Sequence, residues 1–91
     1  MATIGTREAE ALELALRLRD LRKRMSMSQA EFAERFGLGL MALKQWELQD
    51  RTPDRAAHTL IAMIVTDPDR VMSVLDRYNR QREEEQQLTA A

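Results

Sequence analysis

The chain has 91 residues with a formal net charge of −1, and 44% of them are hydrophobic and 32% charged. These proportions are typical of one globular domain and exclude a chain that is basic throughout. The absence of cysteine excludes disulfides and thiolate metal sites. The longest apolar run, residues 60–65, is too short to cross a bilayer, and residues 1–10 lack the apolar core of a signal peptide, so we expect a cytoplasmic protein. With one histidine and no glycine-rich phosphate loop, the sequence predicts neither an enzyme nor a metal or cofactor site.

Charge is distributed unevenly along the chain. Five basic residues fall within eight positions that contain one acid, Asp20, whereas three consecutive acids occupy positions 83–85. Such a basic cluster is typical of a surface that binds phosphate groups, and equally of an ordinary solvated helix face, so both interpretations stay open. The basic residues are Arg17, Arg19, Arg22, Lys23 and Arg24.

The first predicted element is a helix over residues 7–24. Leu14, Leu18, Leu21 and Met25 recur at spacings of four, three and four, which is the period of one helical face. Thr6 precedes this stretch as a candidate N-cap, whose hydroxyl would accept a hydrogen bond from a first-turn amide. We therefore expect the four apolar residues in the core.

Two short helices joined by a tight turn are predicted next. Ser28 and Glu31 form the Ser-x-x-Glu pattern of a capping box, so the second helix should begin after Ser28. Gly37 is expected to end that helix in a left-handed conformation. The third helix should run over residues 40–48, with Gly39 as a weak N-cap. The apolar residues predicted to face the core are Phe32, Ala33 and Phe36 in the second helix and Leu43 and Trp46 in the third.

Two further helices are predicted from a repeated start signal. The triplets Thr-Pro-Asp at 52–54 and Asp-Pro-Asp at 67–69 each offer a capping side chain, a proline at the first helical position and an acid in the first turn. The sequence becomes polar after Tyr78, so residues 79–91 either extend the fifth helix into solvent or form a disordered tail. No segment alternates like a strand, and the predicted fold class is all-α with five helices. The predicted core positions are Ala57, Leu60, Ile61 and Ile64 in the fourth helix and Val71, Val74, Leu75 and Tyr78 in the fifth.

Residues 29–48 have the pattern of a helix-turn-helix. Ala33 is small where two helices must cross closely, and Gly37 permits a sharp turn four residues later. Leu43 and Trp46 would then fix the orientation of the second helix. In this arrangement the second helix enters the major groove of DNA with its N-terminal residues at the base edges.

Four segments of the chain resemble the XRE (Cro/CI-type) helix-turn-helix family. The segments around 53–61 and 67–75 are similar to its YiaG-like branch, which includes antitoxins of the HigA and MqsA type. The resemblance covers residues 14–76 and implies a lambda-repressor-like fold. Gln49 departs from the pattern, because a glycine usually stands there. The segments that carry the family resemblance are Ser28-Gln-Ala-Glu-Phe-Ala, Phe36-Gly-Leu, Leu43-Lys-Gln-Trp-Glu and Arg51-Thr-Pro.

The resemblance implies roles for individual residues. Gln29 matches a position that binds backbone phosphate, and Arg22 and Glu47 match a pair that ties the first helix to the recognition helix. The exposed positions of the recognition helix match Leu40, Met41, Lys44 and Gln45.

The type of side chain at each exposed position predicts how that position would contact DNA. Lys44 could bind guanine and Gln45 adenine, while Leu40 and Met41 would pack against thymine methyl groups. Two arginines flank the next loop and would contact phosphates. The predicted DNA-binding residues are therefore Gln29, Leu40, Met41, Lys44, Gln45, Arg51 and Arg55.

These assignments predict a DNA-binding domain over residues 14–78, an N-terminal helix extension over 1–13 and a polar tail over 79–91. We expect a homodimer that binds a pseudo-palindromic operator in double-stranded DNA and represses transcription. The dimer surface is expected in the last two helices or the tail, with Met63 and Met72 as candidates. Two alternatives stay open. The chain could be the antitoxin of a toxin-antitoxin operon, with a cognate toxin as partner. It could also be a protein-interaction module with little DNA specificity, which the apolar Leu40 and Met41 favour.

Overall fold

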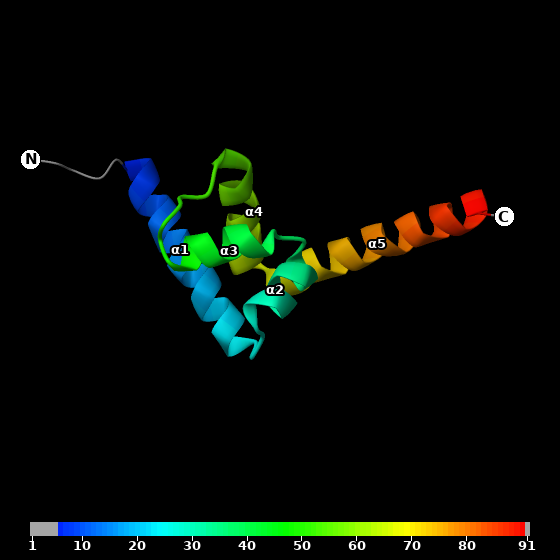
Figure 1. Ribbon diagram of the computed structural model, residues 1–91, viewed down its shortest axis with the longest axis horizontal. Coiled ribbons are helices and arrows are strands. Elements are labelled where there is room, and N and C mark those ends of the chain that lie inside the picture. The colour runs from blue at the N-terminus through cyan, green and yellow to red at the C-terminus, as the bar shows by residue number, and fades with distance from the viewer. Residues whose placement is uncertain (1–5, 91) are drawn as a thin grey trace, which may run out of the picture.

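The computed structural model describes residues 6–90, which are all-helical, with five helices and no strand among them. This confirms the predicted all-α class. Figure 1 shows α1 to α4 gathered at one end of the molecule, while most of α5 extends away from them. The molecule is therefore elongated, with extents of 64 × 26 × 23 Å. The helices are α1 (Thr6–Arg24), α2 (Gln29–Phe36), α3 (Leu40–Glu47), α4 (Arg55–Thr66) and α5 (Pro68–Ala90).

Local hydrogen bonds explain where α2 and α3 begin. Ser28 Oγ accepts a hydrogen bond from the Glu31 amide, and the Glu31 carboxylate accepts one from the Ser28 amide, both at 3.0 Å, so the predicted capping box is present. Gly37 adopts φ 67°, a left-handed conformation that glycine reaches without steric cost. Gly39 precedes α3 without a side-chain cap, as expected.

The starts of α4 and α5 differ in the position of their capping residue. Asp67 Oδ1 accepts a hydrogen bond from the Arg70 amide at 3.2 Å, and α5 begins at Pro68 as predicted. In α4 the prediction was wrong, because the N-cap is Asp54, whose carboxylate accepts from the Ala57 amide at 2.8 Å. The residues at 52 and 53 therefore lie in the preceding loop. Thr6 likewise occupies a helical position of α1 rather than the predicted N-cap.

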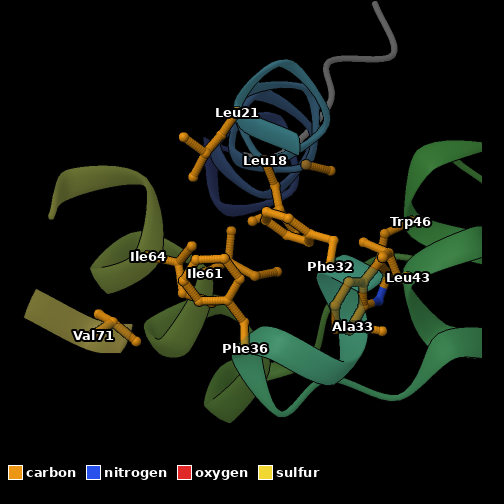
Figure 2. Close-up of a cluster of buried hydrophobic side chains, with 11 residues drawn as sticks. Leu18, Leu21, Phe32, Ala33, Phe36, Leu43, Trp46, Ile61, Ile64 and Val71 are labelled. Atoms are coloured by element: carbon orange, nitrogen blue, oxygen red, sulfur yellow. The ribbon is translucent and has the colours of Figure 1, made fainter. Parts of the chain in front are cut away.

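The core lies where α1, α2, α3 and α4 meet. Figure 2 shows buried side chains converging from these helices, with Val71 of α5 at the edge of the cluster. The rings of Phe32 and Phe36 lie 4.7 Å apart at 47° to one another. Each such side chain contributes about 1.5–3 kcal/mol when fully buried. The largest fully buried side chains are Leu18, Phe32, Phe36, Leu43, Ile61 and Ile64.

Two predicted core residues of α5 are instead on the surface. Val74 is 57% exposed and Tyr78 55% exposed, because α5 packs on the other helices only near its N-terminal end. Val71 is buried as predicted, and Leu75 is half-buried. The predicted core residues Leu14, Met25, Ala57 and Leu60 are half-buried at the rim of the core.

The polar segment after Tyr78 continues α5 as a helix to Ala90, which is one of the two predicted alternatives. At about 1.5 Å of rise per residue, residues 78–90 extend roughly 20 Å. Arg35 of α2 donates hydrogen bonds to both carboxylate oxygens of Asp76, at 2.7 and 3.2 Å, close to the point where α5 leaves the core. The predicted domain boundaries, after residues 13 and 78, fall inside α1 and α5.

Candidate nucleic-acid interface

The candidate site is formed by α2 and α3 and the three-residue turn between them. The turn contains Gly37, and the amide of Leu38 donates back to the Ala33 carbonyl at 2.8 Å, which ends α2 sharply. Ala33 belongs to the same buried cluster as Leu43 and Trp46 of α3. A larger side chain at position 33 would push α3 away, so this alanine sets how closely the two helices pack.

α3 has one buried face and one exposed face. Leu43 and Trp46 are buried in the core, whereas Leu40, Met41 and Lys44 lie exposed on the outer face, and Met41 is 66% exposed. Gln45 is half-buried beside them. Three of the four residues predicted to read bases are therefore accessible to a ligand, and the fourth has restricted access.

A network of hydrogen bonds fixes the C-terminal end of α3. Arg22 of α1 donates to both carboxylate oxygens of Glu47, from Nε and Nη2, each at 2.7 Å. Its Nη1 donates to the Met27 carbonyl at 3.0 Å, and Gln29 of α2 donates from Nε2 to Glu47 at 3.2 Å. The structure thus joins the predicted pair and adds Gln29 to it.

Most of this network is shielded from solvent. The Arg22 and Glu47 side chains are 14% and 7% exposed, so the two charges interact largely outside bulk water. Hydrogen bonding to Glu47 raises the pKa of Arg22 above its usual value, against a smaller effect of burial. The guanidinium group therefore stays charged, and its planar fork holds the carboxylate in one orientation. Three helices are locked together at this point.

The network also limits which atoms of Gln29 are free to bind a phosphate group. One of its amide N–H groups is directed to Glu47 rather than outward. The residue is the first of α2, where backbone N–H groups favour an anion. A phosphate contact by Gln29 would therefore use the backbone amide or the remaining side-chain atoms.

The predicted basic residues are divided between two sides of the molecule. Arg17, Lys23 and Arg24 line a cleft against Val65 and Thr66 at the end of α4, whereas Arg22 turns toward α3. The cluster of α1 therefore does not act as one surface beside α3. Arg51 and Arg55 are exposed after α3, and neither forms an ion pair within residues 6–90.

Comparison with known proteins leaves the family of the chain open. No family model, curated protein or solved structure matches it. Within the described part of the chain, no group of His, Cys, Asp and Glu side chains is placed to hold a metal ion. None of the helices over residues 6–90 is long and apolar enough to cross a membrane.

Next to the exposed face of α3, sequence reasoning missed one residue and did not assign the backbone conformation of another. Leu48, which follows α3, is 71% exposed and adds an apolar side chain to this end of the helix. Gln49 has a left-handed φ of 62°, and its amide donates to the Trp46 carbonyl at 3.1 Å. The signal for Gln49 was present in the sequence, because glycine is the residue that adopts this conformation without strain.

Proposed function

We propose that the chain is a sequence-specific DNA-binding repressor of transcription with a lambda-repressor-like, XRE-type helix-turn-helix fold. It binds a pseudo-palindromic operator as a dimer. The observation that carries this proposal is the presentation of α3. Leu43 and Trp46 bury one face of the helix, and the Arg22–Glu47 pair fixes its end, while the opposite face is free. A rigid helix with one free face is what insertion into a major groove requires.

The side chains of the free face suit direct contact with base edges. Lys44 can donate to O6 and N7 of guanine, and the side-chain amide of Gln45 can form hydrogen bonds with adenine. Leu40 and Met41 offer apolar contact to thymine methyl groups. Arg51 and Arg55 would hold the flanking backbone through phosphates, which sets the position of α3 along the groove.

The proposal is tested by fluorescence anisotropy with duplex DNA from upstream of the gene and a scrambled duplex of the same composition. The two arginines of each subunit give the dimer about four phosphate contacts. Raising the salt concentration fourfold from about 50 mM should therefore weaken binding of the dimer roughly a hundredfold. The upstream duplex should bind more tightly at both salt concentrations. Equal binding to the two duplexes would contradict sequence-specific recognition.

A pair of double variants assigns the contact surface. Lys44→Ala with Gln45→Ala should reduce the preference for the upstream duplex by at least about thirtyfold, since two base contacts of about 1–3 kcal/mol each are lost in every half-site. Arg80→Ala with Gln87→Ala removes the same kinds of group from the far half of α5 and should leave the preference intact. Equal losses in both variants would place the readout elsewhere.

A second candidate function is favoured by the apolar character of the same face. Leu40 and Met41 of α3 and Leu48, which follows it, are all exposed, and none of their side chains can donate a hydrogen bond to a base. Under this alternative, α3 binds a partner protein, and the chain has no salt-dependent affinity for DNA. An antitoxin would combine both functions, with a toxin as the additional partner. Binding of a toxin encoded beside the gene, measured by calorimetry, would distinguish that form from a simple repressor.

A further inference from the structure

The exposed half of α5 has the spacing of a helix that pairs with another helix. Val74, Tyr78, Gln81, Glu85 and Leu88 follow one another at intervals of four, three, four and three residues. Val74, Tyr78 and Leu88 give this 3.5-residue register apolar members, as in the seam between two paired helices, whereas Gln81 and Glu85 are polar members near its middle. Figure 1 shows this half of α5 alone, beyond the other helices. An isolated polar helix of this length is marginally stable in water, so a partner along the seam would stabilise it.

The seam leads into an apolar groove between α4 and α5. Leu60 and Met63 line the groove from α4, and Val71 and Val74 line it from α5. Met63 is exposed, and Val74 belongs to both the groove and the seam. Leu88, at the far end of the same seam, is 81% exposed. The chain therefore presents an apolar groove at one end of the seam and an exposed apolar side chain at the other.

We propose that a second copy of this chain occupies the seam, with the two α5 helices antiparallel. An antiparallel arrangement places Leu88 of each copy beside the groove of the other, next to Val71. The seam, the groove and Leu88 are then covered in one interface whose two halves are identical, as twofold symmetry requires. This pairing would supply the dimer surface of the proposed repressor, and its biological purpose rests on that proposed function.

The charges that flank the seam select the antiparallel orientation. Arg77 and Glu84 lie seven residues apart on one flank, and Arg82 lies on the other. Antiparallel helices bring like flanks together, so Arg77 of each copy faces Glu84 of the other, which gives two opposite-charge pairs. Parallel helices bring opposite flanks together, so Arg77 would face Arg82, a repulsive pair. Flanking charges of this kind set the orientation of paired helices.

Sedimentation equilibrium of the full chain without DNA tests the pairing. The expected mass rises with concentration to twice the 10.5 kDa of one chain. Arg77→Glu should weaken dimerisation about tenfold, because both opposite-charge pairs become like-charge pairs. Glu84→Arg should do the same, and the double variant Arg77→Glu with Glu84→Arg should restore dimerisation. These residues project into solvent beyond the core, so the variants keep the fold.

The matched control exchanges the same charges on another face of the same helix. Arg80→Glu with Glu83→Arg should leave dimerisation unchanged, since neither residue flanks the seam. Stronger dimerisation of Arg77→Glu would overturn the antiparallel orientation in favour of the parallel one. A wild-type chain that stays monomeric at all concentrations would overturn the pairing itself.

The outcomes separate this inference from the proposed function. A chain that dimerises with the expected charge dependence but binds no DNA would support the pairing and refute the repressor. A chain that binds the upstream duplex selectively while its charge variants dimerise equally well would refute the α5 pairing alone.

Discussion

Replacing Glu47 by alanine should weaken the protein more than any other exchange of a charged residue near α3. Glu47 accepts three hydrogen bonds, two from Arg22 and one from Gln29. Removing one partner of a buried ion pair typically costs about 3–5 kcal/mol, because the other charge stays buried and unpaired. The Arg22 side chain is 14% exposed and regains some hydration, so we expect a loss of about 3 kcal/mol in the free energy of unfolding. Urea unfolding followed by the fluorescence of Trp46, the single tryptophan, measures this directly.

A double-mutant cycle separates the ion pair from simple loss of packing. Arg22→Met and Glu47→Leu should each destabilise the protein by an amount similar to that of Glu47→Ala, whereas the two combined should cost far less than the sum of the two single losses. The expected coupling free energy is about 2 kcal/mol or more. Additive losses, or a loss below about 1 kcal/mol for Glu47→Ala, would refute the view that this pair fixes α3.

Three further changes test local features of the fold. Ser28→Ala removes the acceptor of the capping box and should lower the free energy of unfolding in urea by about 1 kcal/mol, whereas no change would argue against the cap. Gln49→Gly relieves a left-handed φ of 62° and should raise the same quantity by roughly 0.5–1 kcal/mol, and a decrease would show that the conformation is unstrained. Hydrogen bonds from Arg35 lower the pKa of Asp76. The Arg35–Asp76 pair therefore contributes its full stability above the usual pKa of a carboxyl group. This contribution is lost as the pH falls through the lowered pKa of Asp76. Asp76→Asn should flatten that part of the stability curve in acid titrations followed by circular dichroism, and an unaltered curve would exclude the pair as its cause.

The short helices could be predicted because their signals are local. The Ser28–Glu31 capping box and Gly37 fix the two ends of α2 within a few residues of sequence. Phe32 and Leu43 were predicted in the core from spacing alone and are fully buried. The accessible face of α3 follows from the same spacing, since Leu40, Met41 and Lys44 lie on the helix opposite Leu43 and are exposed.

The remaining features depend on contacts between distant residues. The apolar period of α5 shows that one face of the helix is suited to burial, but not which residues have a partner, so Val74 and Tyr78 were misplaced. Arg35 and Asp76 are 41 residues apart, and no spacing rule relates them. Gln29 was assigned to phosphate from a sequence pattern, whereas its bond to Glu47 exists only because α2 and α3 fold together.

The projecting part of α5 has a consequence for hydrodynamics. The radius of gyration is 15.5 Å, whereas a compact chain of this length would have about 12 Å. A single copy therefore experiences more friction than a sphere of equal mass and elutes early from a gel-filtration column, at the volume of a larger globular protein. Its rotational tumbling is also anisotropic, so NMR relaxation of amides in α5 differs from that in helices lying across the long axis. An early elution volume is thus expected of the monomer and the dimer alike.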